Sequence, residues 1–280
     1  MLYAPRTICL HANNKERTSR LITSQSLGQR VKPFMSLEVL KAGEISAFDE
    51  ASRLSDSGTA IITFLISGEA DFSVSTQKQG RLKQGDALWM LSGSGIQYSL
   101  TPKTADCVSV KLRVALSPAL ENAPAQSIHL NSAWIESDGP ARVLLGQHGH
   151  ACGQLAFPAL VNYFVVSLVA GQAWTYEPLA NHQVAWAAVL SGKIKTSDTQ
   201  VKPDQIAVYE NSHQAINFLA EEDTVFLLGT SNQFSSQQYL YPQYPDQEFT
   251  RDLAEQHAAS GLNKTFNKAP SEISVLRMCS

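Results

Sequence analysis

The sequence predicts an all-β protein made of two small barrels in tandem, followed by one C-terminal helix. Three observations favour this fold class. Short apolar runs bounded by turn residues recur along the chain, one pattern of strands and turns occurs twice, and only one late segment has a helical pattern. The chain has 280 residues, 44% of them hydrophobic and 17% charged, which suits two compact domains.

The apolar runs are the candidate strands. They are short and rich in Val, Ile, Phe and Tyr, and Gly, Asn, Ser or Asp commonly follows them. This rhythm is typical of antiparallel β-structure. The runs span residues 60–67, 87–91, 107–116, 141–146, 160–169, 184–192, 205–210 and 224–229.

The pattern that occurs twice has two landmarks. In each copy an apolar strand ends in Ser-Gly, at residues 67–68 and again at residues 191–192. A polar strand follows, and a short turn at residues 84–86 or 203–205 leads into the next apolar strand. Because neither sheet can cover its own apolar face, each copy is expected to roll into a small barrel. The strand rhythm alone leaves open an ordinary pair of β-sandwiches.

The helical segment covers residues 245–260. Phe249, Leu253 and His257 would share one face, and Gly261 stands where a C-cap would lie. We expect an appended C-terminal helix.

Composition excludes several classes of function. The net charge is −3 with acids and bases scattered, so no basic face is available for direct nucleic-acid binding. No apolar run approaches the roughly 18 residues that span a bilayer, and no signal-peptide core is present, so no membrane association is expected. Cys9, Cys107, Cys152 and Cys279 lie far apart without a CxxC pair, which favours a reducing, cytoplasmic location.

The stretch GDALWMLSGSGI at residues 85–96 resembles the second motif of the pirin family, a group of bicupins. The shared pattern is GD, two residues, WM, two residues, and GxGI. Further pieces in the same order, at residues 24–40, 64–69, 220–229 and 249–266, extend the resemblance over most of the chain. The matching motif residues are Gly85, Asp86, Trp89, Met90, Gly93, Gly95 and Ile96.

The resemblance implies two tandem cupin barrels of the double-stranded β-helix, or jelly-roll-like, kind. We expect an N-terminal barrel at residues 20–125, a C-terminal barrel at 126–245, and a helix and tail at 246–280. Pirins are described as iron-binding nuclear co-regulators or, in some bacteria, as quercetin 2,3-dioxygenases. These activities are only candidates for this chain, because proteins with the same fold can have different functions.

The family's metal ligands have no histidine counterparts here. The resemblance places them on two histidines before a strand and on a His-x-Glu pair after GxGI. Those positions fall on Leu54 and Asp56, and on Tyr98 and Leu100. Leucine has no lone pair to donate, and tyrosine would ligate only as a costly phenolate. We therefore expect no metal at the family site and no cofactor, with iron or another divalent cation only if the site were retained.

One other pattern resembles a metal site. His148, His150 and Cys152 form an HxHxC run whose donors would share one side of an extended segment, with His182 or His213 as an extra ligand. The glycines that flank the run favour instead a loop or strand edge.

Two functions follow as hypotheses. The first is a non-catalytic small-molecule-binding or regulatory protein that takes an apolar or aromatic ligand or docks a protein partner. Its pocket would lie near Leu54, Asp56, Trp89, Tyr98 and Leu100, and no catalytic residue is assigned. The alternative is a quercetin 2,3-dioxygenase-like oxidoreductase with an atypical metal site, or a metal-free reaction with Asp56 as base and Tyr98 as donor. The missing ligands count against oxygen chemistry.

Overall fold

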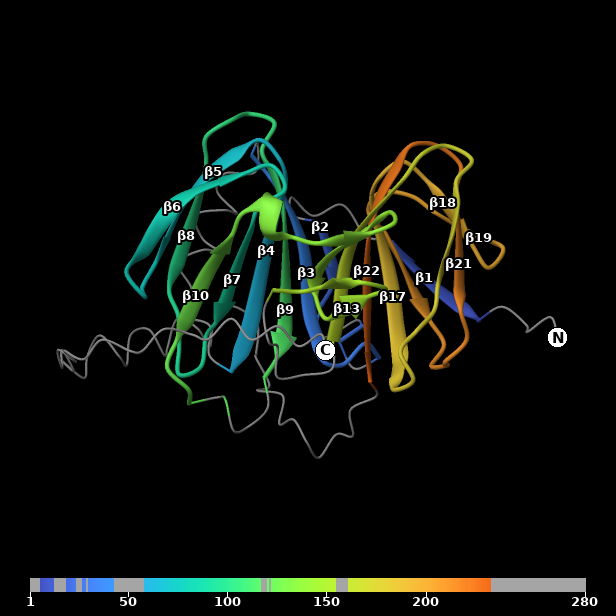
Figure 1. Ribbon diagram of the computed structural model, residues 1–280, viewed down its shortest axis with the longest axis horizontal. Helices are drawn as coiled ribbons and strands as arrows, with labels where there is room; N and C mark the ends of the chain where they lie inside the picture. Colours follow the sequence, from blue (N-terminus) through green and yellow to red (C-terminus); the bar gives the residue numbers. More distant parts are fainter. Residues whose placement is uncertain are drawn as a thin grey trace.

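The computed structural model describes residues 6–12, 19–23, 27–28, 30–42, 58–116, 120, 122–154 and 161–232. In these ranges the chain is almost entirely strand, arranged as two barrels side by side (Figure 1). The all-β, two-barrel prediction is confirmed. The one helical element described with bounds is a 3₁₀ turn, Ser132–Trp134. The helix expected at 245–260 lies outside the described residues.

The first barrel packs a six-stranded sheet against a three-stranded sheet. The larger sheet has the order β10-β7-β4-β9-β3-β2 and the smaller one the order β6-β5-β8, with antiparallel neighbours throughout. The strands are β2 (Ser19–Ile22), β3 (Phe34–Lys41), β4 (Thr59–Ser67), β5 (Glu69–Val74), β6 (Lys78–Lys83), β7 (Ala87–Leu91), β8 (Tyr98–Pro102), β9 (Val108–Ala115) and β10 (Gln126–Leu130).

The second barrel repeats this plan with a seven-stranded and a four-stranded sheet. Their orders are β1-β20-β17-β22-β15-β12-β11 and β16-β21-β18-β19, and β13 and β14 form a separate hairpin. The strands are β1 (Ile8–Ala12), β11 (Ser137–Asp138), β12 (Ala141–Leu145), β13 (Gln147–His148), β14 (Ala151–Cys152), β15 (Val161–Leu168), β16 (Ala173–Tyr176), β17 (His182–Ser191), β18 (Ile194–Thr196), β19 (Thr199–Val201), β20 (Gln205–Tyr209), β21 (Ile216–Ala220) and β22 (Thr224–Asn232).

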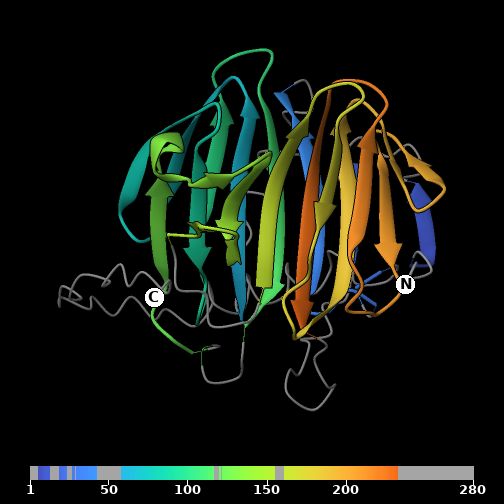
Figure 2. The same cartoon turned by 45° about the vertical axis from the view of Figure 1, so that its right-hand side comes forward.

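Strand pairing differs from the expected boundary between the barrels. β10 begins at residue 126, where we expected the second barrel to start, yet it pairs with β7 in the first. β1 precedes the whole first barrel but pairs with β20 in the second, at whose outer edge it lies (Figure 2). Each barrel is therefore completed by a strand that simple division of the sequence assigns elsewhere.

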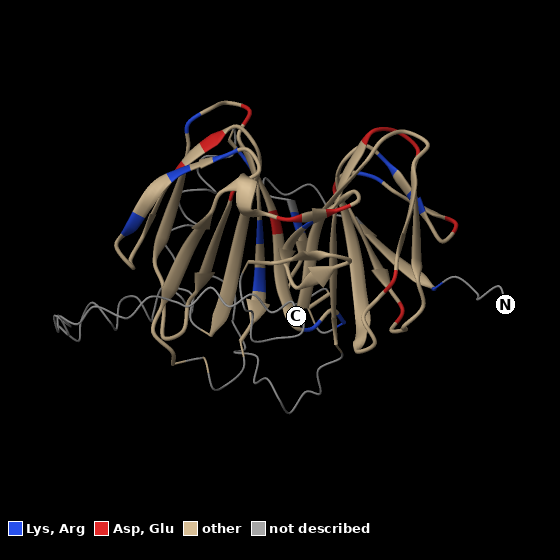
Figure 3. Cartoon of the chain, viewed as in Figure 1, with Lys and Arg blue, Asp and Glu red and all other residues tan. Residues whose placement is uncertain are grey.

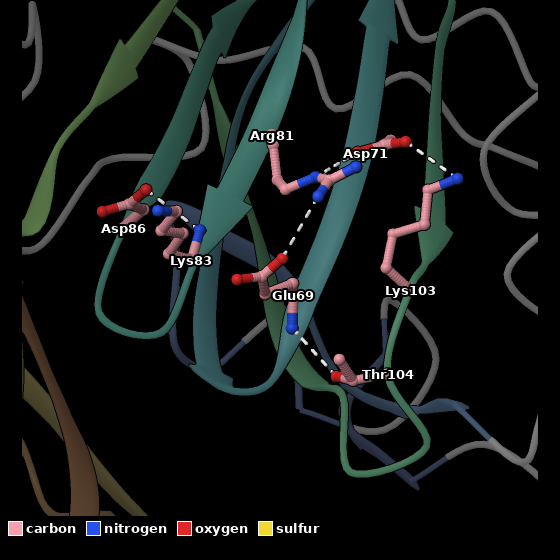
Figure 4. A network of polar contacts seen from close by, with 7 residues as sticks. All are labelled: Glu69, Asp71, Arg81, Lys83, Asp86, Lys103 and Thr104. Carbon is pink, nitrogen blue, oxygen red and sulfur yellow. Dashed lines mark hydrogen bonds and ion pairs between the residues drawn. The ribbon is translucent and has the colours of Figure 1, made fainter.

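The first landmark of the repeat has the same structure in both barrels. Gly68 and Gly192 have φ values of 74° and 75°, in the left-handed region that favours glycine. The backbone N–H of the following residue then donates to a threonine hydroxyl, at 3.0 Å for Thr104 and 2.8 Å for Thr224. Figure 4 shows the first-barrel copy of this bond.

The second landmark also agrees in geometry. Gly85 and Asp204 have φ values of 85° and 63°. In the first turn the backbone N–H of Lys83 donates to the Asp86 side chain at 3.0 Å. In the second turn the backbone N–H of Lys202 donates to the Gln205 side chain at 3.1 Å. The first of these bonds is drawn in Figure 4. The repeated sequence pattern therefore encodes the two corners of one structural unit.

The apolar core has three parts: one inside each barrel and one between the two large sheets. Along β7 the side chains alternate, so that Leu88 and Met90 face the interior of the first barrel while Trp89 faces the core between the barrels. In that central core Phe34 of β3 meets Trp186 of β17 edge-on, with ring centroids 5.3 Å apart. Among the described segments, no helix has the length and apolar character needed to cross a membrane.

Candidate functional site

A row of polar side chains crosses the inner face of the first barrel. Glu38 of β3 pairs with Lys111 of β9, and Lys111 pairs with Thr63 of β4. Their neighbours along each strand belong to the core between the barrels, so alternation directs these three side chains into the barrel. Figure 3 shows the basic stretch on β9 in the middle of the molecule, whereas most other charged residues lie near strand ends and loops.

An ion pair forms the centre of this row. Lys111 Nζ lies 2.7 Å from Glu38 Oε2, and the side chains are only 2% and 7% exposed. Arg113 Nη1 lies 3.8 Å from the other carboxylate oxygen. Burial alone would raise the pKa of Glu38, but the charges of Lys111 and Arg113 and the hydrogen bond from Lys111 outweigh it and lower that pKa to about 2. Among the described residues, the carboxylate of Glu38 is thus in contact with the two cations Lys111 and Arg113.

Three hydroxyls surround the pair. Thr63 Oγ1, Ser109 Oγ and Ser36 Oγ are buried and have no hydrogen-bond partner among the described residues. Ser109 and Ser36 lie two residues before Lys111 and Glu38 on the same strands, so they share the inner face. A buried polar group without a hydrogen bond lowers stability by about 1–3 kcal/mol. Each hydroxyl is therefore expected to form a hydrogen bond with water or with a bound molecule.

The predicted pocket residues separate into three groups. Tyr98 and Leu100 on β8 are 6% and 4% exposed and belong to the apolar cluster inside the first barrel, with Phe72. Trp89 lies in the core between the barrels, on the opposite face of the large sheet from that cluster, so it does not share a wall with Tyr98. Leu54 and Asp56 fall outside the described residues.

The described residues of this barrel do not fit a divalent cation. Glu38 is already engaged by Lys111, and a second cation, Arg113, lies beside it. Metal sites need several converging oxygen, nitrogen or sulfur donors. Throughout the part of the chain that the structure describes, no cluster of three His, Cys, Asp or Glu side chains could hold a metal ion.

The HxHxC run does not bring its donors together. Instead of extending, the segment turns back as the hairpin β13-β14, in which Gln147 pairs with Cys152 and His148 with Ala151. Neighbouring residues of a strand face opposite sides, so His148 and Cys152 do not share a face, and the shared side we expected is wrong.

The histidines of this region have other contacts. His148 packs on rings of the second barrel, 5.4 Å from Trp174 and 5.8 Å from Tyr176 between centroids, and burial lowers its pKa although Asp138 opposes the shift. His182 and His213, considered as extra ligands, instead contact Thr230 at 2.9 Å and Gln183 at 3.0 Å.

A second charged cluster lies on the outside of the first barrel (Figure 4). Arg81 contacts Asp71 at 2.8 Å and Glu69 at 3.4 Å, and Lys103 contacts Asp71 at 2.9 Å. These side chains are between 37% and 51% exposed, so solvent screens them. The buried row is the better functional candidate.

Sequence reasoning missed the polar row, although a signal was present. In VSVKLRVA (108–115), Ser109, Lys111 and Arg113 alternate with Val and Leu. A strand buried on both faces reads as continuous apolar sequence, so charges at period two mark a face that is buried yet polar.

Residues 15–114 match the Pirin family. Among solved structures, a quercetin 2,3-dioxygenase from Acinetobacter baumannii aligns with a TM-score of 0.72 and 19% identity, covering 92% of this chain and 98% of that one. YhhW from Escherichia coli aligns with a TM-score of 0.62 and 13% identity, covering 81% and 99%. The nickel(II) complex of the same bacterial pirin aligns with a TM-score of 0.61 and 12% identity, covering 81% and 100%. No match was found among curated proteins. At these identities the structural likeness shows the fold.

Proposed function

We propose that this chain is a pirin-like bicupin and that it is a non-catalytic small-molecule-binding or regulatory protein, whose first barrel binds an organic anion with an apolar or aromatic body. The observation that carries the proposal is the buried ion pair of Lys111 and Glu38. An ammonium group donates up to three hydrogen bonds, so Lys111 can donate to an anionic group of a ligand as well as to Glu38.

The wall opposite the polar row determines what kind of group the remainder of the ligand should carry. Phe72, Tyr98 and Leu100 are buried on the small sheet, and together they favour an apolar or aromatic group. The unpartnered hydroxyls of Thr63 and Ser109 would serve the polar end. An aromatic carboxylate or a phenolate combines both requirements.

The alternative function is a quercetin 2,3-dioxygenase-like oxidoreductase with an atypical metal site. The likeness to the Acinetobacter baumannii dioxygenase is the observation in its favour. Against it stands the chemistry of the described residues, since the Glu38 carboxylate is already bound by Lys111 and Leu100 offers no donor atom.

A first experiment separates the two functions. Elemental analysis of the purified protein, before and after chelation, should find no stoichiometric iron, nickel or copper. Turnover of quercetin after iron is added, with stoichiometric uptake of the metal, would overturn the proposal and support the dioxygenase.

A second experiment tests the ligand. In a thermal-shift titration, 4-hydroxybenzoate and quercetin should raise the melting temperature of the wild type. Thr63→Val, which removes a hydroxyl but leaves the ion pair, should weaken binding by about three- to ten-fold, the worth of one hydrogen bond. The exposed Thr101→Val is the matched control and should bind as the wild type does. If none of the compounds shifts the wild type, the small-molecule proposal fails and a protein-docking role replaces it.

The same proposal covers setting and partners. It places the protein in the cytoplasm, with no metal cofactor and no direct contact with nucleic acid or membrane. The balanced charge of the sequence supports the absence of nucleic-acid contact.

A further inference from the structure

The N-terminal segment carries an arginine into the second barrel. β1 pairs with β20 in the register Ile8 to Tyr209, and just before β1 the side chain of Arg6 is buried, with 5% of the residue exposed. Its Nη2 donates to the carbonyl oxygen of Ser212, beyond the end of β20. The guanidinium therefore lies at the end of the barrel where β17 begins, because the N–H of Ser212 in turn donates to Gln183.

This guanidinium lacks a counter-ion. Among the described residues, Nε and Nη1 of Arg6 have no hydrogen-bond partner, and no ion pair joins Arg6 to a carboxylate. Arginine stays charged in proteins, and a buried charge without a partner is strongly unfavourable. The site is thus built around a cation that the described protein does not neutralise.

Apart from Arg6, the buried polar groups described at this end of the barrel are neutral, and the carboxylate of Glu210, which follows β20, is on an exposed residue. Asn162 Nδ2 donates to the Tyr176 hydroxyl at 3.1 Å, and the Thr230 hydroxyl contacts both Tyr176 at 3.0 Å and His182 Nδ1 at 2.9 Å. Burial lowers the pKa of His182 to about 4, so its imidazole is uncharged at neutral pH. Burial raises the pKa of Tyr176, whose phenol lies within the electrostatic reach of Arg6.

We propose that this end of the second barrel is a binding site for a small organic carboxylate, with Arg6 as its anchor and the Tyr176 hydroxyl as a neighbouring polar contact. The single uncompensated charge selects a monoanion over a dianion such as phosphate. The fork of N–H donors on a guanidinium suits the two oxygens of a carboxylate. The site is separate from the polar row of the first barrel and does not depend on the function proposed there.

The test is a titration of the full chain with acetate, monitored by the melting temperature of the protein and by NMR line broadening of the ligand. The wild type should bind saturably, and Arg6→Gln should weaken binding by about ten-fold or more, as expected for loss of a charged hydrogen-bonding partner. Arg30→Gln removes an exposed arginine and is the matched control, which should leave affinity unchanged. Equal affinity in the wild type and Arg6→Gln, or no saturable binding to the wild type, would overturn the proposal.

Two further variants keep the test decisive if Arg6→Gln fails to fold. Tyr176→Phe keeps the ring and removes only the hydroxyl, so it should fold and bind acetate several-fold more weakly; wild-type affinity for acetate would contradict the assignment. Thr63→Val, in the first barrel, should not alter acetate binding, and an effect there would assign the acetate to the other site. Inorganic phosphate that competes as well as acetate would overturn the choice of a monoanion.

Discussion

At the scale of single residues, the first barrel is defined by how its interior charge is balanced. Lys111 is 2% exposed in its side chain, and its ammonium has a carboxylate at 2.7 Å. Desolvating both groups is costly, and only their close contact offsets that cost. The pair is therefore sensitive to the loss of either partner.

The first prediction concerns this pair. Lys111→Met should lower the free energy of unfolding by about 3–5 kcal/mol, because it leaves the buried carboxylate of Glu38 without its main partner. The double variant Glu38→Leu/Lys111→Met should recover most of that loss, since it removes both charges. Chemical denaturation of the wild type, both single variants and the double variant measures the coupling. If the double variant lost as much free energy of unfolding as the two single variants together, the charges would act independently.

The second prediction concerns pH. The pKa of His182 is lowered from 6.5 to about 4 by burial, so as pH falls the unfolded chain takes up a proton before the folded protein does. Stability from this residue is full above pH 6.5 and falls between pH 6.5 and 4, by up to about 3 kcal/mol. His182→Gln should flatten this part of the stability profile measured by urea unfolding. The exposed His150→Gln is the control, and it should keep the wild-type slope.

The sequence shows which residue types are present, but it does not show pairing between residues that lie far apart in the chain. The absence of histidine between residues 12 and 128 is visible in the sequence. The partner of Lys111 is not, because Glu38 lies on a strand far away in the chain and only the register of β3 with β9 joins them. The alternation in VSVKLRVA indicated a polar inner face but named no partner.

At the scale of elements, turns fix the repeat. Gly192 has a φ of 75°, and a Cβ built there would lie 2.2 Å from the carbonyl oxygen of Asp223. Gly171 has nearly the same φ, 79°, but nothing lies within 4 Å of its Cβ position. A side chain at Gly171 would therefore meet only the cost of the left-handed backbone conformation, whereas a side chain at Gly192 would also clash with its neighbours.

The third prediction uses that contrast. Gly171→Ala should cost about 1–2 kcal/mol, the penalty of an L-residue in the left-handed region. Gly192→Ala should cost clearly more, because the backbone of Asp223 must also move away. The denaturation midpoints of the two variants provide the comparison. Equal losses would show that the corner after β17 is more adaptable than its close contacts indicate.

Elements also explain why one sequence interpretation was wrong. HxHxC predicts shared ligands only if the run is extended. Gly149 has a φ of 54° and sits in the turn between β13 and β14, where the carboxylate of Asp138 accepts the N–H of His150 at 2.8 Å. The glycines indicate a loop or strand edge, and the turn at Gly149 sets the direction of the side chains.

At the scale of the whole molecule, the two barrels share one core. The buried cluster between the large sheets contains residues of both barrels, including Leu37 and Val110 from the first and Tyr163 and Val208 from the second. The sequence repeat predicted two units but not this packing, because a period-two strand pattern does not tell which of two buried faces meets the other barrel. β1 strengthens the link, since it precedes the first barrel in the chain and completes the second.

The last prediction follows from that shared core. Trp186 is 0% exposed and contacts Phe34 across the two barrels, and a Cβ on Gly229 would lie 2.2 Å from its ring, so the side chain fills its space closely. Trp186→Ala should lower the free energy of unfolding by about 3–5 kcal/mol. Trp134→Ala removes a tryptophan that is 62% exposed, and it should change stability by less than about 0.5 kcal/mol.

The cooperativity of unfolding is a second, sharper measurement of the role of the shared core. If the barrels depend on their common core, far-UV circular dichroism and tryptophan fluorescence should report one coincident transition in the wild type. Trp186→Ala weakens that core while leaving the interior of each barrel intact, so it should lower the midpoint and begin to separate the transitions of the two barrels. Separate transitions already present in the wild type would show instead that each barrel is stable alone, and that the central packing only orients them.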